Sequence, residues 1–243
     1  MLDKNELHDM LLEMQDYIFS KKMREICSEL NSTKETMRQE FYKNVSAARG
    51  IYTPVPVIVM LTNDKLGRSV KRKQTILKEG DCFYFDDTGI RIAEQYGYGN
   101  KYPLSTSYTF RTGNEEFFFR KDLTGSTSHL GKIWREEDCS ISVFAQPKDG
   151  SRPFPNAKKN DAFFLEIEIR KFKDNLLSEC ECNFGDTFKR DELKLKDYVF
   201  TYNEDGEIAA YYPKDKEEYL CEIPDRYREW IRLRGGLKEV MYF

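Results

Sequence analysis

The chain has 243 residues, with 39 Lys and Arg against 42 Asp and Glu, a formal net charge of −3 and 14% aromatic residues. A chain of this length buries a hydrophobic core without disulfides or metals, and the aromatic content excludes the composition of a disordered chain. No run approaches 18 apolar residues and no basic-then-apolar segment opens the chain, so we expect a soluble, cytoplasmic protein.

Histidine and cysteine restrict the metal chemistry. The two histidines, His8 and His129, lie far apart in the chain, which disfavours histidine metal clusters. Of the six cysteines, only Cys180 and Cys182 are close together, and one such pair is at most half of a zinc site. We therefore assign no metal ligands, and leave open whether this pair binds zinc or consists of reduced thiols.

Residues 1–48 are predicted to form a helical hairpin. Apolar residues recur every three or four positions over residues 3–30, which is typical of an amphipathic helix. Ser32 and Glu35 have the spacing of a capping box and would start a second helix, which Arg49 and Gly50 would end. The apolar stripe must pack on the protein body or on a second copy, so a homodimer through these helices is one expectation.

Residues 51–212 are predicted to form a β-rich body. The apolar, β-branched run 55–61 indicates a buried strand, residues 69–77 a second one, and 79–81 a tight turn before a strand at 82–85. Further strands are expected at 105–110, 116–120, 140–145, 162–172, 198–202 and 207–212, with a hairpin turn at 203–206. About eight short strands predict an antiparallel or mixed sheet.

Residues 213–243 are predicted to form a helical C-terminal segment. Pro224 suits a first helical turn, Tyr227, Trp230 and Ile231 form one apolar face, and the glycines at 235–236 would end the helix. The apolar residues 240–243 are expected to be docked. No linker divides the chain, so we expect a single α+β domain over residues 1–243: an aromatic-rich, mostly antiparallel sheet with an N-terminal helical hairpin and a C-terminal helix.

A basic segment is the first candidate site. Its six cations lie within residues 65–78 and generate a local field that suits phosphate groups in spite of the negative net charge. Tyr84, Tyr96, Tyr98 and Tyr102 would stack on unpaired bases if they share its face, whereas the alternative reading is a solvated edge strand. The cations are Lys65, Arg68, Lys71, Arg72, Lys73 and Lys78.

A second candidate site combines a Ser-Thr-Ser motif at 126–128 with a Glu-x-Glu motif at 166–168. This combination resembles the signature of the Arg-Ser-Glu class of ADP-ribosyltransferases. In that family an arginine contacts the NAD phosphates, the serine motif supports the site, and the last glutamate stabilises the oxocarbenium-like transition state. The resemblance implies NAD as cofactor and Arg91, Ser126, Glu166 and Glu168 as site residues. The glutamate strand is equally typical of a half-exposed strand without catalytic function.

A metal-dependent nuclease is the third hypothesis, because Asp161, Glu166 and Glu168 supply carboxylates that suit Mg²⁺. The glycines of residues 96–100 lack the following Lys-Ser/Thr of a phosphate-binding loop, and predict a turn instead. Whether the protein is an enzyme stays open. Our leading hypothesis is a cofactor-free binding protein that contacts nucleic acid or an acidic partner through the basic segment and the long loop 146–160, which we expect to lack regular structure.

Overall fold

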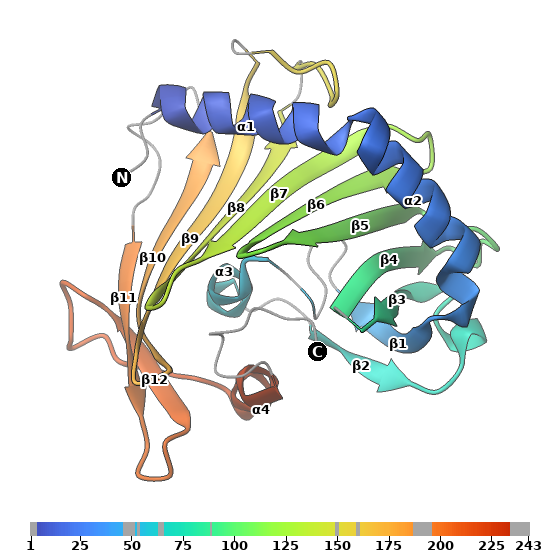
Figure 1. Ribbon diagram of the computed structural model, residues 1–243. Coiled ribbons are helices and arrows are strands. Elements are labelled where there is room, and N and C mark those ends of the chain that lie inside the picture. Colours follow the sequence, from blue (N-terminus) through green and yellow to red (C-terminus); the bar gives the residue numbers. More distant parts are fainter. Residues whose placement is uncertain are drawn as a thin grey trace.

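A computed structural model of the protein defines residues 4–45, 52, 54–62, 66–87, 89–148, 151–158, 161–186 and 196–233. A curved antiparallel sheet of 13 strands dominates this part of the chain (Figure 1). From β3 to β13 each strand pairs with its neighbour in the sequence, whereas β1 lies between β3 and the edge strand β2. The first seven strands are β1 (Arg38–Val45), β2 (Leu66–Val70), β3 (Glu79–Asp86), β4 (Gly89–Gly97), β5 (Ser105–Thr112), β6 (Glu115–Asp122) and β7 (Thr127–Arg135). The remaining six are β8 (Cys139–Pro147), β9 (Phe163–Lys173), β10 (Leu176–Asp186), β11 (Lys196–Tyr202), β12 (Ile208–Pro213) and β13 (Cys221–Glu222).

The N-terminal helical segment is confirmed, but with different bounds. Helix α1 (Lys4–Ile18) is followed by α2 (Lys21–Thr33), whose N-terminus is capped by the Ser20 hydroxyl accepting a hydrogen bond from the Met23 amide. The predicted second helix is wrong: residues 34–36 form a short 3₁₀ helix, η1, and the chain then enters β1. The Ser32 hydroxyl donates to the Glu29 carbonyl, so this residue belongs to the last turn of α2 and does not cap a new helix.

The strand predicted at residues 55–61 is also wrong. These residues form the short helix α3 (Pro56–Leu61), with Pro56 in its first turn. Five of the six residues are buried, so the sequence shows apolar residues on every side of the helix. A helix that is buried all round has no polar stripe, and its sequence cannot be distinguished from that of a buried strand.

Most of the other predicted strands are confirmed. They run from 82–85, which lies within β3, to 207–212, which starts one residue before β12. The hairpin turn at 203–206 is confirmed by Gly206 with a φ of 76°. The turn predicted at 79–81 is wrong, because those residues open β3, and only the start of 69–77 is strand. After β2 the chain forms a 3₁₀ helix, η2 (Lys73–Thr75). Strands β1, β4, β7, β10 and β13 were not expected from the sequence.

The two faces of the sheet carry separate cores. Helices α1 and α2 pack on the face that we call the outer face, where Leu11, Met14 and Leu30 join sheet residues such as Leu130 and Val143. The apolar stripe of the N-terminal helices is thus buried against the protein's own sheet. Helices α3 and α4 (Asp225–Leu233) pack on the inner face, on the inside of the curve (Figure 1).

Two predicted features outside the sheet are partly confirmed. In α4, Tyr227, Trp230 and Ile231 are buried as expected, whereas residues 235–236 and 240–243 lie outside the described residues. In the loop 146–160, residues 146 and 147 extend β8, and the described remainder has no helix or extended strand. Phe154 is nevertheless buried and stacks on Phe163, with ring centroids 5.4 Å apart. This part of the loop is packed on the sheet.

Candidate functional site

The glutamate strand places its charged residues inside the protein. Side chains alternate along β9 as predicted, but both faces are buried: Glu166 is 2% exposed, and Glu168 and Arg170 are fully buried. They project from the inner face, toward α3. The expectation of a half-exposed strand is therefore wrong, and the cost of burying these charges must be offset by their partners.

Glu168 and Arg170 form a buried ion pair that holds α3 on the sheet. The Arg170 guanidinium donates to the Glu168 carboxylate at 3.1 Å and to the hydroxyls of Ser140 and Ser142 at 2.8 and 2.6 Å. The other carboxylate oxygen accepts a hydrogen bond from the Ile58 amide at 2.6 Å. Burial raises the pKa of Glu168 to about 7, against the opposing effects of Arg170 and the α3 amides. These contacts account for the pair as structural.

The residues implied by the resemblance to ADP-ribosyltransferases are not brought together. Arg91 lies on β4, with its Nε 3.5 Å from the Asp86 carboxylate. Ser126 is exposed in the turn between β6 and β7. Glu168 pairs with Ser142 of β8, and Ser142 pairs with Ile133 of β7, so Glu168 and Ile133 lie at the same level of the sheet. Ser126 precedes Ile133 in the chain, which places it roughly 20 Å from Glu168 along the strand direction.

The carboxylates proposed for Mg²⁺ are also separated. Asp161 lies before β9 and accepts hydrogen bonds from the Arg152 guanidinium and the Lys158 amide, both at 2.7 Å. It therefore has its own partners and takes no part in the ion pair of Glu168 with Arg170. Cys180 and Cys182 are buried on the inner face with their sulfur atoms 3.5 Å apart. Within the described residues, no group of three or more His, Cys, Asp and Glu side chains is arranged to hold a metal ion.

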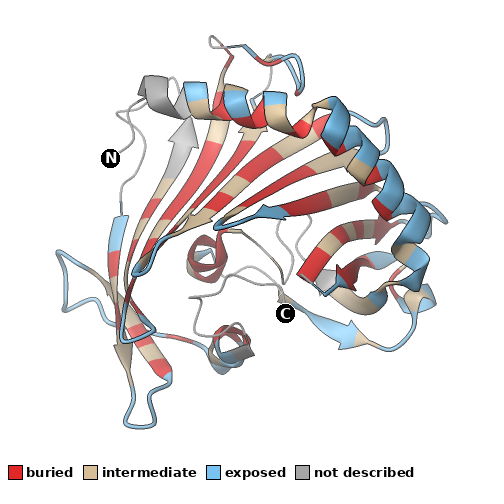
Figure 2. Cartoon of the chain, viewed as in Figure 1, coloured by how far each residue is buried: buried red, intermediate tan, exposed pale blue. Residues whose placement is uncertain are grey.

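The basic segment follows the edge of the sheet. Lys65 lies outside the described residues, and Arg68 is on the edge strand β2, whose central residues are exposed (Figure 2). Lys73 faces inward: its ammonium is 2.9 Å from the Tyr84 hydroxyl and 3.9 Å from the Glu94 carboxylate. Lys71, Arg72 and Lys78 are exposed. Of the six predicted contact residues, Lys73 is thus an anchor for the segment.

Lys73 is anchored next to a buried carboxylate on the outer face, that of Glu94. Glu94 accepts hydrogen bonds from Lys34 and from the hydroxyls of Tyr84 and Tyr96, at 2.8 and 2.5 Å for the tyrosines. Burial would raise the pKa of Glu94, but the hydrogen bonds from Lys34, Tyr96 and Tyr84 outweigh it and hold the pKa below its ordinary value. Tyr84 and Tyr96 are therefore structural and do not offer rings to a ligand.

One further cation belongs to this edge. Lys43 of β1 is the direct cross-strand partner of Arg68 of β2. Like charges directly opposite one another destabilise a strand pair, and neither side chain has a hydrogen bond or ion pair in the described part of the chain. Sequence reasoning missed Lys43 because it assigned this residue to a helix. We call Lys43, Arg68, Lys71, Arg72 and Lys78 the cationic edge.

An exposed tyrosine adjoins the cationic edge in an unfavourable backbone conformation. Tyr98 is 91% exposed and has a φ of 58°, and Gly99 follows with a φ of 71°. The Asn100 amide donates to the Gly97 carbonyl, which closes a tight turn of the kind that Asn and Gly normally fill. The Tyr98 amide donates to the Lys78 carbonyl at 2.9 Å. Tyr102, 69% exposed, follows the turn.

Comparisons with family models, curated proteins and solved structures gave no match for this chain. No helix among the described residues is long and apolar enough to cross a membrane.

Proposed function

We propose that the protein binds single-stranded nucleic acid through the cationic edge and the turn that carries Tyr98. The observation that carries this proposal is the position of Tyr98. Its side chain is exposed and its amide bonds to the Lys78 carbonyl, although its backbone conformation costs about 1–3 kcal/mol for a residue other than glycine. Strain of this kind persists where the surrounding structure holds a residue in place, and it is concentrated at binding and active sites.

The charges of the edge suit a phosphate backbone. Lys43 and Arg68 repel one another across two strands, and a phosphate group between or beside them relieves that repulsion. In the strand register, Lys43 of β1 pairs with Arg68 of β2 on one side and with Gly80 of β3 on the other. Because β3 begins one residue after Lys78, Arg68 and Lys78 are about two strands apart. Two strand spacings amount to about 10 Å, a span that a few nucleotides cover.

The tyrosines favour nucleic acid over an acidic protein. A cationic edge attracts either partner, but exposed aromatic rings next to cations are the arrangement that binds unpaired bases by stacking. Tyr98 and Tyr102 are both exposed beyond the end of β4, and the Lys101 ammonium lies 5.9 Å from the centre of the Tyr102 ring. A duplex keeps its bases stacked inside, so it would gain only the phosphate contacts.

The proposal is tested by fluorescence anisotropy with a labelled single-stranded oligonucleotide, the same sequence as a duplex, and polyglutamate. We expect the single strand to bind most tightly, with four phosphate contacts giving about a 50-fold loss of affinity between 50 and 200 mM salt. The double charge reversal Arg68→Glu and Lys78→Glu should weaken binding at least tenfold. Tyr98→Asn should weaken binding about 5- to 150-fold through lost stacking, while the turn remains favourable.

Matched controls separate this from general effects of charge or exposed rings. Lys21→Glu with Lys22→Glu makes the same change in net charge on the exposed face of α2, and Tyr219→Ser removes an exposed tyrosine near β13. Both should bind like the unmodified protein. Equal affinity for single strand and duplex, preference for polyglutamate, or binding that ignores the Tyr98 substitution would each contradict the proposal.

A further inference from the structure

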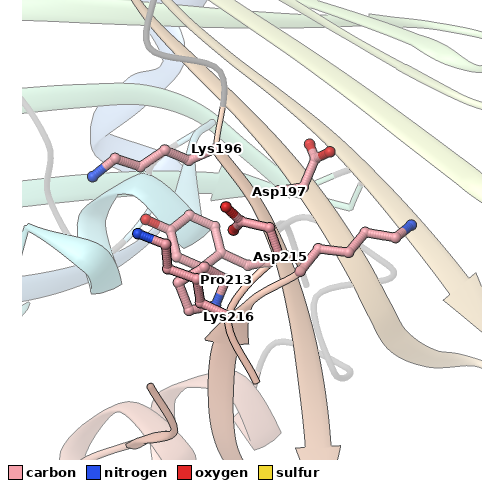
Figure 3. A pocket seen from close by; sticks show the side chains of 7 residues that line it. Lys196, Asp197, Pro213, Asp215 and Lys216 are labelled. Carbon is pink, nitrogen blue, oxygen red and sulfur yellow. The ribbon is translucent and has the colours of Figure 1, made fainter. Parts of the chain in front are cut away.

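A pocket of about 510 Å³ lies at the opposite end of the sheet from β2, where β11 begins and β12 ends (Figure 3). This volume lies within the range of about 300–1,000 Å³ that is usual for small-molecule sites. Both strands and the residues after β12 contribute to its wall. The lining residues are Lys196, Asp197, Tyr198, Pro213, Lys214, Asp215 and Lys216.

Tyr198 supplies a hydroxyl group to the wall of this pocket. Its side chain is only 7% exposed, and the ring packs edge-on against Tyr211 with centroids 5.6 Å apart. Its hydroxyl makes no hydrogen bond within the described residues, and a phenolic hydroxyl is able both to donate and to accept one. Burial raises the pKa of Tyr198 to about 12, so the hydroxyl keeps its proton and is able to donate it in a hydrogen bond.

The lysines of the pocket divide between the two faces of the sheet. Lys214 donates to the Glu179 carboxylate at 2.8 Å and is thereby satisfied. Lys196 lies two residues before Tyr198 on β11, and alternation puts both on the inner face. Figure 3 shows Lys196 and Lys216 extending to one side of the strands and Asp197 to the other. Neither Lys196 nor Lys216 has a carboxylate within 4 Å in the described chain.

We propose that this pocket binds a small molecule with a phosphate or carboxylate group, held by the Lys196 and Lys216 ammonium groups and the Tyr198 hydroxyl. The carboxylate of Asp215 lies in the same pocket and accepts a hydrogen bond from a hydroxyl or amino group of the ligand. The ring of Tyr198 and Pro213 provide the apolar wall. This site is independent of the cationic edge.

The test uses two-dimensional NMR of the ¹⁵N-labelled protein during titration with inorganic phosphate, and separately with acetate. We expect saturable shifts of the amides of residues 196–198 and 214–216, and the more effective anion identifies the ligand group. Lys196→Gln together with Lys216→Gln should raise the dissociation constant at least tenfold. Tyr198→Phe, which removes only the hydroxyl, should raise it severalfold.

Lys214→Gln is the matched control, since it removes a lysine of the same pocket whose charge is already paired with Glu179. It should change the dissociation constant less than twofold. Phosphate could also bind at the cationic edge, so the titration is repeated with the Arg68→Glu and Lys78→Glu protein, in which the shifts at the pocket should persist. Absent or non-saturating shifts at the pocket, or equal losses in the Lys214 and Lys196/Lys216 variants, would overturn the proposal.

Discussion

The buried pair of Glu168 and Arg170 allows a quantitative prediction. Replacing Arg170 by Met leaves a carboxylate without its counter-ion at a position with no solvent exposure, and removing one partner of such a pair costs about 3–5 kcal/mol. Replacing Glu168 by Met leaves the guanidinium uncompensated, at a similar cost. It also leaves the Ile58 amide without its acceptor, which adds about 1–3 kcal/mol.

The double replacement should cost less than either single one. With both charges absent, the two methionines fill an apolar site next to the inner-face core, and the main remaining penalty is the orphaned Ile58 amide of α3. Apolar replacement of a whole buried pair is often neutral or stabilising. We therefore expect a loss of about 1–3 kcal/mol for the double variant, and a coupling energy of several kcal/mol between Glu168 and Arg170.

Urea unfolding followed by tryptophan fluorescence measures these differences. With a slope near 3 kcal/mol per M, a loss of about 4 kcal/mol moves the midpoint down by about 1.3 M. The slope should be unchanged between variants, which serves as a control for the two-state comparison. Losses that simply add in the double variant, or single losses below about 1 kcal/mol, would refute the assignment of the pair as a coupled structural contact.

Two further predictions concern the same inner face. Burial raises the pKa of Asp81 to about 7. Between about pH 4 and pH 7 the folded protein therefore keeps a proton on Asp81 that the unfolded chain has released, so the contribution of this group to the free energy of unfolding falls as the pH rises. The stability of Asp81→Asn relative to the unmodified protein should therefore rise by roughly 2 kcal/mol between pH 5 and pH 8 in urea titrations, and a pH-independent difference would contradict this. Gly131→Ala would place a methyl group within the ring of Phe118, so we expect the free energy of unfolding to fall by about 1–3 kcal/mol in the same assay. Gly113→Ala is the comparison: its methyl group would lie in open space, so only the positive φ of residue 113 opposes it and the loss should be smaller.

The strands that were predicted from the sequence are those with a local signal. The turn at 203–206 has Gly206 where positive φ is needed and Asn203 as an acceptor for the amides of the turn, and the alternation of β9 is visible in its residues 165–170. Strand β1 has no such signal, because Met37, Phe41 and Val45 have the spacing of a helix. Its conformation is determined by pairing with β3, which lies far along the chain. Tertiary pairing of this kind overrides local propensity.

The candidate site was only partly accessible to sequence reasoning. A count of cations located the basic segment, but it could not separate Lys73, which contacts Tyr84 and Glu94, from its exposed neighbours. It could not find Lys43 either, since this residue joins the edge through the register of β1 and β2. Nor does composition tell that Tyr84 is buried while Tyr98 is exposed, because that depends on which residues the sheet turns inward.

The strand order has a consequence for how the chain folds. From β3 to β13 every strand pairs with its sequence neighbours, so most of the sheet is able to grow by successive addition of hairpins, and most steps close a loop shorter than the connection between β8 and β9. β1 is the exception, because it has to pair with both β2 and β3 after a connection that includes α3. We therefore expect the edge that carries Lys43 and Arg68 to be completed late in folding, and to open before the centre of the sheet in native-state hydrogen exchange.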